Sequence, residues 1–383
     1  MTRRGWAAIA VGLLGVTVAI IWLRAGPAPT SQQVAGAPPG AVIPGPALTT
    51  PPPDELAHDV VPQMDHAKPA SGSQRAGPPR AAASSADVEL CGIGRVPLRM
   101  APGASAPDAL PDHLGPAAAD AGRWALHAAL DAGDARARAA AILLRGTDAG
   151  GGEPSQALQA LAEQTSDATV VAWALARCRD DKPCRVRMAQ RWQALEPDNV
   201  AAWLEGLSGS AEEIAQARHA IASAERFQLH WGALPATMLD HMPANVLPYL
   251  HSMLVVEAIG VEAALTLPSM TPLVAICRPR PAPGSQAQGQ CDAAARVLAE
   301  RSDTILGRRI GVRMGELAGW PAAEVAARRA LSQNLQLGVS GIDEKHPLSC
   351  ASAAKTRAWV QAVAKLGEFD AYQSLVAASS PQR

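Results

Sequence analysis

The fold class is indicated most clearly by residues 305–318, ILGRRIGVRMGELA. Large apolar side chains recur in it at spacings of four, four and three residues: Leu306, Ile310, Met314 and Leu317. This spacing predicts an amphipathic helix over 305–318 that buries these side chains on one face. The next three residues, Gly319-Trp320-Pro321, predict that this helix stops and another starts.

Similar helix signals occur along the rest of the chain. Ser210-Ala211-Glu212-Glu213 is a capping box that predicts a helix running toward Phe227. Pro183 stands where a first helical residue is expected, and Gly367 separates two short apolar-periodic stretches. Aromatic residues make up only 3% of the chain, and runs of alternating β-branched residues are rare. The sequence therefore predicts an all-α fold in which helical hairpins stack into a repeat-like, solenoid-like array.

Two stretches resemble tetratricopeptide repeats. Residues 192–204, WQALEPDNVAAWL, resemble the junction between two such repeats, with a helix end, a proline, an asparagine and a new helix start. Residues 366–371, LGEFDA, are similar to the turn inside one repeat. The resemblance implies a helical solenoid that binds peptides or partner proteins in a concave groove. The 34-residue period does not extend along the chain, and we assign no site residues from the resemblance.

The N-terminal 24 residues predict a membrane anchor. Nineteen uncharged residues, Gly5 to Leu23, follow Arg3 and Arg4, and a helix needs about 20 apolar residues to cross a bilayer. The alternatives are a cleaved signal peptide and a buried soluble helix, but the run is longer than a usual signal sequence. The positive charges before the run keep the N-terminus in the cytoplasm. We therefore expect a single-pass protein of a bacterial inner membrane, with its C-terminal domain in the periplasm.

The chain after the anchor changes composition twice. Residues 25–88 hold 13 prolines in 64 positions and no aromatic residue, which predicts a disordered linker. Residues 89–112 are expected to be extended or loop-like, with a possible short strand near Val88–Met100. Residues 113–383 are expected to form the exported helical domain, which is long enough for a sizeable core.

The six cysteines predict disulfides, because an even count is typical of exported chains. Cys178 and Cys184 flank a short turn, and Cys277 and Cys291 bracket a loop rich in Pro, Gly and Gln. Cys91 and Cys350 remain for each other. A zinc site and free thiols are the alternatives, although no C-x-x-C motif occurs.

Few other residues suggest a binding site. A group of soft ligands could suit copper, but it is better explained as core: Met238, Asp240, His241, Met242, His251 and Met253. Arg308, Arg309 and Arg313 form a basic helical face that we interpret as solvated, so no nucleic-acid partner is predicted. No cofactor is predicted.

The function expected from the sequence is binding, by a membrane-tethered exported helical scaffold with a protein or peptide partner in the cell envelope. The motifs H-E-x-x-H, G-x-S-x-G and the Gly-rich phosphate loops are all absent. An enzyme with dispersed catalytic residues, such as a cell-wall hydrolase using Glu205, Glu257 or Glu316, is the alternative. An exported metal- or ligand-binding protein is a third hypothesis. A polar pocket with a carboxylate of shifted pKa would favour the enzyme, and a long apolar groove would favour the scaffold.

Overall fold

The structure, a computed structural model, describes residues 85–99, 114–146, 153–337 and 348–379. These residues form helices and a single β-hairpin, so the all-α prediction is confirmed for this part of the chain. None of the described helices is both long and apolar enough to cross a membrane. The anchor predicted at 1–24 and most of the linker predicted at 25–88 lie outside the described residues.

The first half of the described chain holds the hairpin and the helices up to α7. The hairpin comprises β1 (Ser85–Leu90) and β2 (Gly94–Arg99). The helices are α2 (Pro116–Asp131), α3 (Ala135–Arg145), α4 (Glu153–Gln164), α5 (Ala168–Arg177), α6 (Lys182–Leu195), the 3₁₀ helices η1 (Val200–Trp203) and η2 (Glu205–Ser208), and α7 (Ala211–Ser223).

The second half begins with a hairpin of two helices and ends with two helices on either side of a single glycine. Its helices are α8 (Ala233–Asp240), α9 (Pro248–Ala263), α10 (Thr271–Ala275), α11 (Gln286–Arg301), α12 (Ile305–Ala318), α13 (Ala322–Leu337), α14 (Cys350–Leu366) and α15 (Glu368–Ser379).

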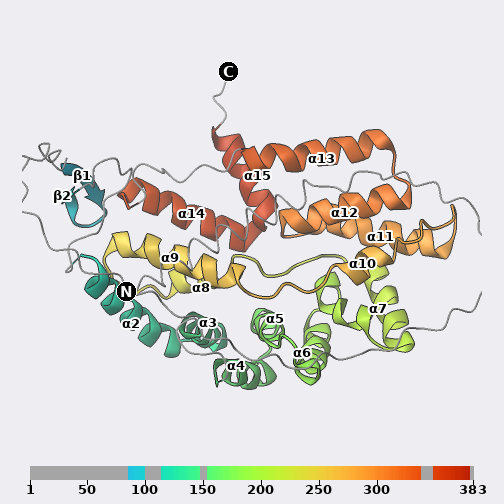
Figure 1. Ribbon diagram of the computed structural model, residues 1–383, viewed down its shortest axis with the longest axis horizontal. Helices are drawn as coiled ribbons and strands as arrows, with labels where there is room; N and C mark the ends of the chain where they lie inside the picture. Colours follow the sequence, from blue (N-terminus) through green and yellow to red (C-terminus); the bar gives the residue numbers. More distant parts are fainter. Residues whose placement is uncertain (1–84, 100–113, 147–152, 338–347, 380–383) are drawn as a thin grey trace, which may run out of the picture. The chain divides into compact units, whose positions relative to one another are not determined.

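The helices pack in a closed series, in which the last helices contact helices from the first half of the chain. Consecutive helices pack against each other from α2 to α7, and α7 packs against α11 (Figure 1). The contacts continue through α12, α13, α15 and α14. Helix α14 then packs on α8 and α9, and these two pack on α3. Helices distant in sequence therefore enclose a common interior.

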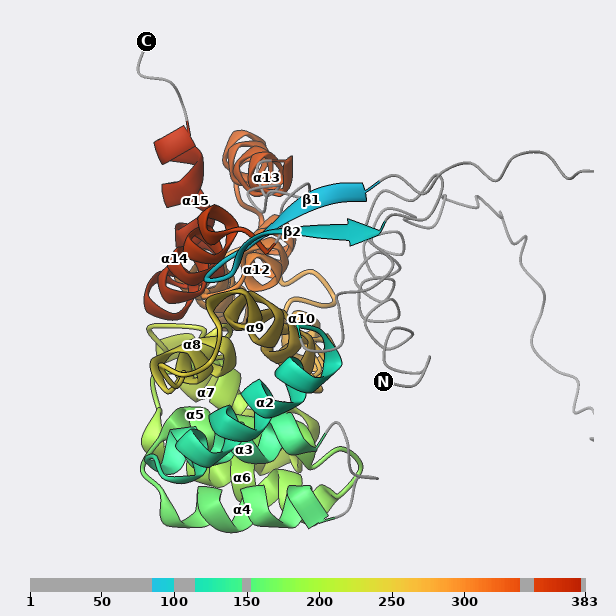
Figure 2. The ribbon, with the colours of Figure 1, turned by 90° about the vertical axis from the view of Figure 1, so that its left-hand side faces the viewer.

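The β-hairpin is fastened at its turn to the N-terminal ends of α9 and α14 (Figure 2). Cys91 N donates to Leu348 O at 3.0 Å, and Tyr249 N donates to Cys91 O at 3.1 Å. The hairpin begins at Ser85, so the last four residues assigned to the linker belong to a strand instead. The lead-in at 89–112 is a strand and a turn as far as Arg99.

Three disulfides are present, in the pairs that the sequence predicts. Cys91 is joined to Cys350, 259 positions away, with the Cα atoms 4.5 Å apart. The other two bonds close short loops, Cys178–Cys184 and Cys277–Cys291. Among the described cysteines none is free.

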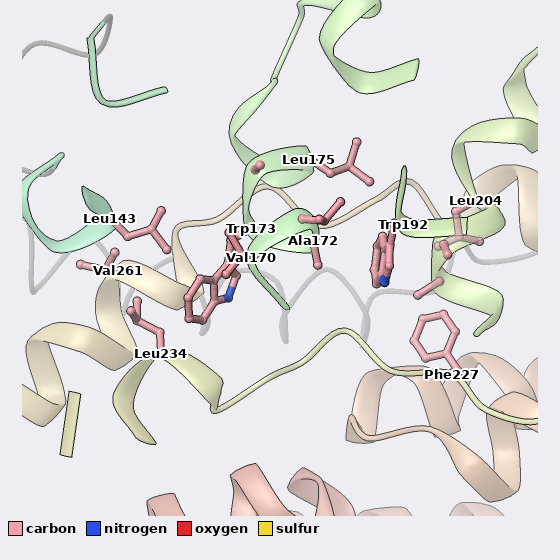
Figure 3. Packing of buried hydrophobic residues seen from close by; sticks show 14 of the residues in the cluster. Leu143, Val170, Ala172, Trp173, Leu175, Trp192, Leu204, Phe227, Leu234 and Val261 are labelled. Atoms are coloured by element: carbon pink, nitrogen blue, oxygen red, sulfur yellow. The ribbon is translucent and has the colours of Figure 1, made fainter. Parts of the chain in front are cut away.

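One apolar core joins most of the helices. In Figure 3 the Trp173 side chain of α5 points toward Leu143 of α3, Leu234 of α8 and Val261 of α9. Phe227, between α7 and α8, is fully buried in the same cluster. This core fixes the loop that carries Phe227 against the surrounding helices.

Helix α12 spans 305–318 as predicted, and the predicted apolar face is buried in part. Met314 is fully buried and Ile310 and Leu317 pack against the core, but Leu306 is exposed. The buried face also contains Gly307, Gly311 and Gly315. A Cβ on Gly311 would lie 2.7 Å from Leu298 Cβ and closer still to the Ala299 backbone nitrogen. Small residues on this face let α12 approach the backbone of α11.

Several of the other predicted helix boundaries are confirmed. Ser210 and Glu213 form the capping box, but the helix ends at Ser223 and does not reach Phe227. Gly319 ends α12 in the left-handed conformation. The stretch after Asn199 forms two short 3₁₀ helices, where the tetratricopeptide resemblance implies an α-helix.

Candidate functional site

The segment between α7 and α8, residues 224–232, runs beside two other interhelical segments; we call it the crossover segment. Val200 N donates to Arg226 O at 2.9 Å, which joins the crossover segment to the start of η1. Asp303 N donates to Phe227 O at 3.0 Å, which joins it to the turn between α11 and α12. Backbone hydrogen bonds therefore hold these three loops together without a regular sheet.

Glu196 and Asn199 hold the middle of the crossover segment. Asn199 accepts from Gln228 N at 2.9 Å and donates to Gln228 O at 3.0 Å. Glu196 Oε2 accepts from Asn199 Nδ2 at 2.9 Å and from Trp192 Nε1 at 2.7 Å, and it lies 3.0 Å from His230 Nε2. Burial alone would raise the pKa of Glu196, but the hydrogen bonds from His230, Asn199 and Trp192 outweigh it and lower the pKa to about 2. Glu196 is therefore an ionised, fully engaged carboxylate.

Two further carboxylates hold the end of the crossover segment. Glu262 accepts from Gly232 N at 2.8 Å and from Leu234 N at 3.1 Å, and Asp303 accepts from Leu229 N at 2.9 Å. Burial raises the pKa of Glu262 to about 7 and that of Asp303 to about 6, although the backbone donors act in the opposite direction. The position of this segment thus depends on two carboxyl groups that titrate near neutral pH.

We expect the folded protein to become more stable as the pH falls from 8 toward 5.5. The folded state then binds protons at Glu262 and Asp303 that the unfolded chain, with ordinary carboxyl pKa values of 4.5 and 3.8, does not bind. A tenfold difference in proton affinity between the folded and unfolded states is worth about 1.4 kcal/mol, so the gain from Glu262 is about 2 kcal/mol. Urea unfolding from pH 5 to pH 8 measures it.

The Glu262→Gln variant is the control for this pH dependence. It is less stable than the wild type, because an amide offers one acceptor to two backbone donors. Its stability should also change less between pH 5.5 and 8. Burial lowers the pKa of His251, which opposes the gain below pH 6.5 in both proteins and cancels in the comparison. If the stability of wild type and variant changes equally with pH, the pH dependence does not arise from Glu262.

The crossover segment lines a cavity of about 1220 Å³. Residues of α3, α5, α8, α11, α12, α14 and α15, or of the turns beside them, complete its wall. Nine of its lining residues are acidic: Asp134, Asp167, Glu196, Asp198, Glu225, Asp240, Glu300, Asp303 and Asp370. Five are basic: Arg136, Arg226, Arg301, Arg308 and Lys365. With His230 counted as neutral, the lining has a net charge of −4.

Three of the lining arginines are already engaged by carboxylates of the same wall. Arg136 donates to Asp167 at 2.7 and 3.0 Å. Arg226 lies 3.2 Å from Glu196 and 3.1 Å from Asp198. Arg308, which is largely buried, donates to Asp370 at 3.2 Å and stacks on the ring of Phe369 at 3.8 Å. These pairs fix the arginine side chains and cancel most of their charge.

The glutamates suggested by the sequence as catalytic candidates do not line the cavity. Glu205 pairs with Arg185, Glu257 with Arg123 and Glu316 with Arg313. Each of them takes part in a salt bridge on the surface of its helix.

Of the group considered for copper, the two histidines are held by local contacts, whereas Asp240 is exposed and lines the cavity. His241 Nδ1 lies 2.9 Å from Thr237 O, and His251 Nε2 lies 3.0 Å from Val246 O. Among the described residues, no group of three or more His, Cys, Asp or Glu side chains could hold a metal ion. Of the basic face interpreted as solvated, Arg308 is instead paired and mostly buried, and Arg309 donates to Ser332 O.

Most of the residues that build the site lie in turns, and Glu262 lies near the end of α9, so the sequence does not single them out. Glu196 and Asn199 occur in the stretch that resembles a repeat junction, but the resemblance assigns no site to them. His230, Glu262 and Asp303 carry no local sequence signal. Comparisons of the chain with protein-family models, with curated proteins and with solved structures found no match.

Proposed function

We propose that the described helices act as an exported scaffold, tethered to the membrane by the N-terminal segment, that binds a protein or peptide partner. The observation that carries this proposal is the size of the cavity, about 1220 Å³. Small-molecule sites are usually about 300–1,000 Å³. A segment of polypeptide is a ligand that suits a larger, polar space.

The three disulfides support an exported location for this domain. Disulfides persist in oxidising compartments such as the bacterial periplasm and are rare in the cytoplasm. Together with the charge-free run of residues 5–23, they support a single-pass inner-membrane protein whose C-terminal domain is periplasmic. The partner would then belong to the cell envelope.

An envelope enzyme is the second candidate, because the cavity is polar and not apolar. Its wall includes Glu196, with a lowered pKa, and Asp303, with a raised one, and such a contrast is common among catalytic acids and bases. Both carboxylates, however, accept hydrogen bonds that hold the loops of the cavity wall. Hydrogen bonds account for the lowered pKa of Glu196 and burial for the raised pKa of Asp303, so neither shift requires a catalytic role and we favour the scaffold.

Site-specific photocrosslinking tests whether the cavity binds a partner. We expect a photoreactive residue at Ser166, which is exposed and lines the cavity, to crosslink a partner in membranes of the source cells. The matched control is Ala160, which is equally classed as exposed but lies on α4 outside the cavity. Absence of an adduct at Ser166, or the same adduct at both positions, would refute binding in the cavity.

A turnover assay separates the two candidates. The scaffold predicts that the full-length protein releases no soluble fragments from purified cell wall beyond the background of Asp303→Asn. The enzyme would be favoured if the wild type releases soluble fragments and the Asp303→Asn variant, with an unchanged helical circular dichroism spectrum, does not. Glu205→Gln, outside the cavity, is the control for nonspecific loss.

A further inference from the structure

The charge of the cavity wall favours a cationic ligand. The lining carries nine carboxylates against five basic side chains. Two of the carboxylates, Asp134 and Asp167, cap the N-termini of α3 and α5, where the helix dipole balances part of their charge. Even without these two, the carboxylates outnumber the arginines and the lysine.

The pairing of the arginines strengthens this preference. Arg136, Arg226 and Arg308 are each held by carboxylates of the wall, so an incoming anion would have to compete for them. Glu225 and Asp240 are exposed, and their carboxylates form no ion pair with the described residues. Of the lining charges that form no ion pair with the described residues, Arg301 and Lys365 are basic, whereas Asp134, Glu225, Asp240 and Asp303 are acidic, so the excess of unpaired charge favours a cation.

Two buried polar atoms of the wall are also unpaired. Asp303 Oδ1 accepts no hydrogen bond, and Arg226 Nε donates none, among the described residues. A ligand with both N–H donors and carbonyl acceptors, such as a peptide, matches this pair of atoms in chemistry. A simple cation could satisfy only the carboxylate.

A smaller pocket, apolar on one side, adjoins the polar cavity. It has a volume of about 270 Å³ and lies between α11, α12, α13 and α15. Val312, Leu331 and Phe369 supply its apolar side, Arg328 and Ser332 line its polar side, and it shares Glu300 and Arg308 with the large cavity. Leu331 is 44% exposed although it is large and apolar. Such a pocket suits one apolar side chain of a ligand whose remainder lies in the acidic cavity.

We propose that the ligand is an extended peptide segment that places lysine or arginine residues in the cavity and one large apolar side chain in the adjoining pocket. This inference rests on the proposed function, since it names the chemistry of the partner bound at that site. The unpaired carboxylates attract the basic residues, and the pocket beside Leu331 anchors the apolar one. A polyamine matches the charge but has no group for the apolar pocket.

Four defined probes test the inference on the full-length protein in detergent micelles. They are a basic nonapeptide with a central leucine, the same peptide with serine for leucine, an acidic nonapeptide with a central leucine, and spermine. Fluorescence anisotropy measures the two basic peptides directly, and competition measures the other two. We expect the basic leucine peptide to bind tightest, its serine form about tenfold more weakly, and binding to weaken as salt rises.

Two variants locate the binding. The double variant Glu225→Gln/Asp240→Asn should weaken binding of the basic leucine peptide about fivefold, because two unpaired lining charges are lost. Its control is Asp180→Asn/Glu89→Gln, which neutralises two exposed carboxylates outside the cavity. Leu331→Ser should weaken binding of the basic leucine peptide about threefold and leave binding of the serine peptide unchanged. Its control is Leu267→Ser, at a matched exposure of 46%.

The outcomes separate this inference from the proposed function. Equal or tighter binding of the acidic peptide, spermine as strong as the leucine peptide, or cavity variants that behave like their controls would each overturn the inference. A Ser166 adduct in membranes without binding of the basic leucine peptide would overturn it as well, and the proposed function would stand. Loss of both the adduct and the peptide binding would overturn both.

Discussion

Replacing Cys91 and Cys350 by serine is expected to lower the free energy of unfolding by about 5 kcal/mol. The bond joins positions 259 residues apart, and a crosslink over so long a loop removes much entropy from the unfolded chain. The backbone hydrogen bonds of Cys91 to Leu348 and Tyr249 remain available in the variant, but they must form without the crosslink. Urea unfolding of the oxidised proteins measures the difference.

The short disulfide provides the control for this effect. Cys178→Ser/Cys184→Ser removes a bond that spans only six positions, so about 2 kcal/mol is expected from the same entropy argument. Both double variants replace two sulfur atoms by hydroxyl groups, so the length of the loop that the disulfide closes is the main difference between them. Equal losses in the two double variants would show that loop length does not decide the stability of this fold.

The Gly311→Ala variant is expected to lose about 2–3 kcal/mol of stability. Its new methyl group would meet the α11 backbone at Ala299 and come within 2.7 Å of Leu298 Cβ, so α11 and α12 must separate. The better helix propensity of alanine, worth up to about 1 kcal/mol, offsets only part of this cost. Thermal and urea unfolding followed by circular dichroism measure the loss.

Gly289→Ala is the matched control, because it makes the same change within α11. No atom of the described structure lies within 4 Å of the Cβ it would add. Without a steric cost, the helix propensity of alanine should raise stability by about 0.5–1 kcal/mol. The two substitutions therefore have opposite expected signs. A stabilising Gly311→Ala would show that the helices are not closely packed at this position.

Helix α12 illustrates how far the sequence determines the fold. The apolar spacing and the Gly-Trp-Pro stop predict its two ends correctly, since these are local signals of helix formation. They predict the burial of Met314 but not that of Gly311, because glycine contributes little to an apolar pattern although it permits the closest approach of two backbones. Leu306 and Gly311 have exchanged the roles that hydrophobicity alone would assign them.

The candidate site shows the opposite case, in which the local sequence says almost nothing. Asn199, Phe227 and Asp303 belong to three different interhelical segments, and Glu368 begins α15; hydrogen bonds bring these parts together only in the folded chain. A turn residue such as Asp303 resembles an ordinary surface aspartate in the sequence. Burial in the folded chain raises its pKa, and the backbone donor that it binds, Leu229 N, lies 74 positions away in the sequence.

The bond between Cys91 and Cys350 also determines how the domain would carry a mechanical load. A pull applied through the residues before Ser85 enters the fold along β1 and reaches Cys91. From there the covalent path crosses directly to the first residue of α14, and the residues between the two cysteines lie outside it. Force between the two ends of the chain therefore bypasses the part of the cavity wall that residues 134–308 supply, and only the α14 and α15 part of the wall lies on the loaded path.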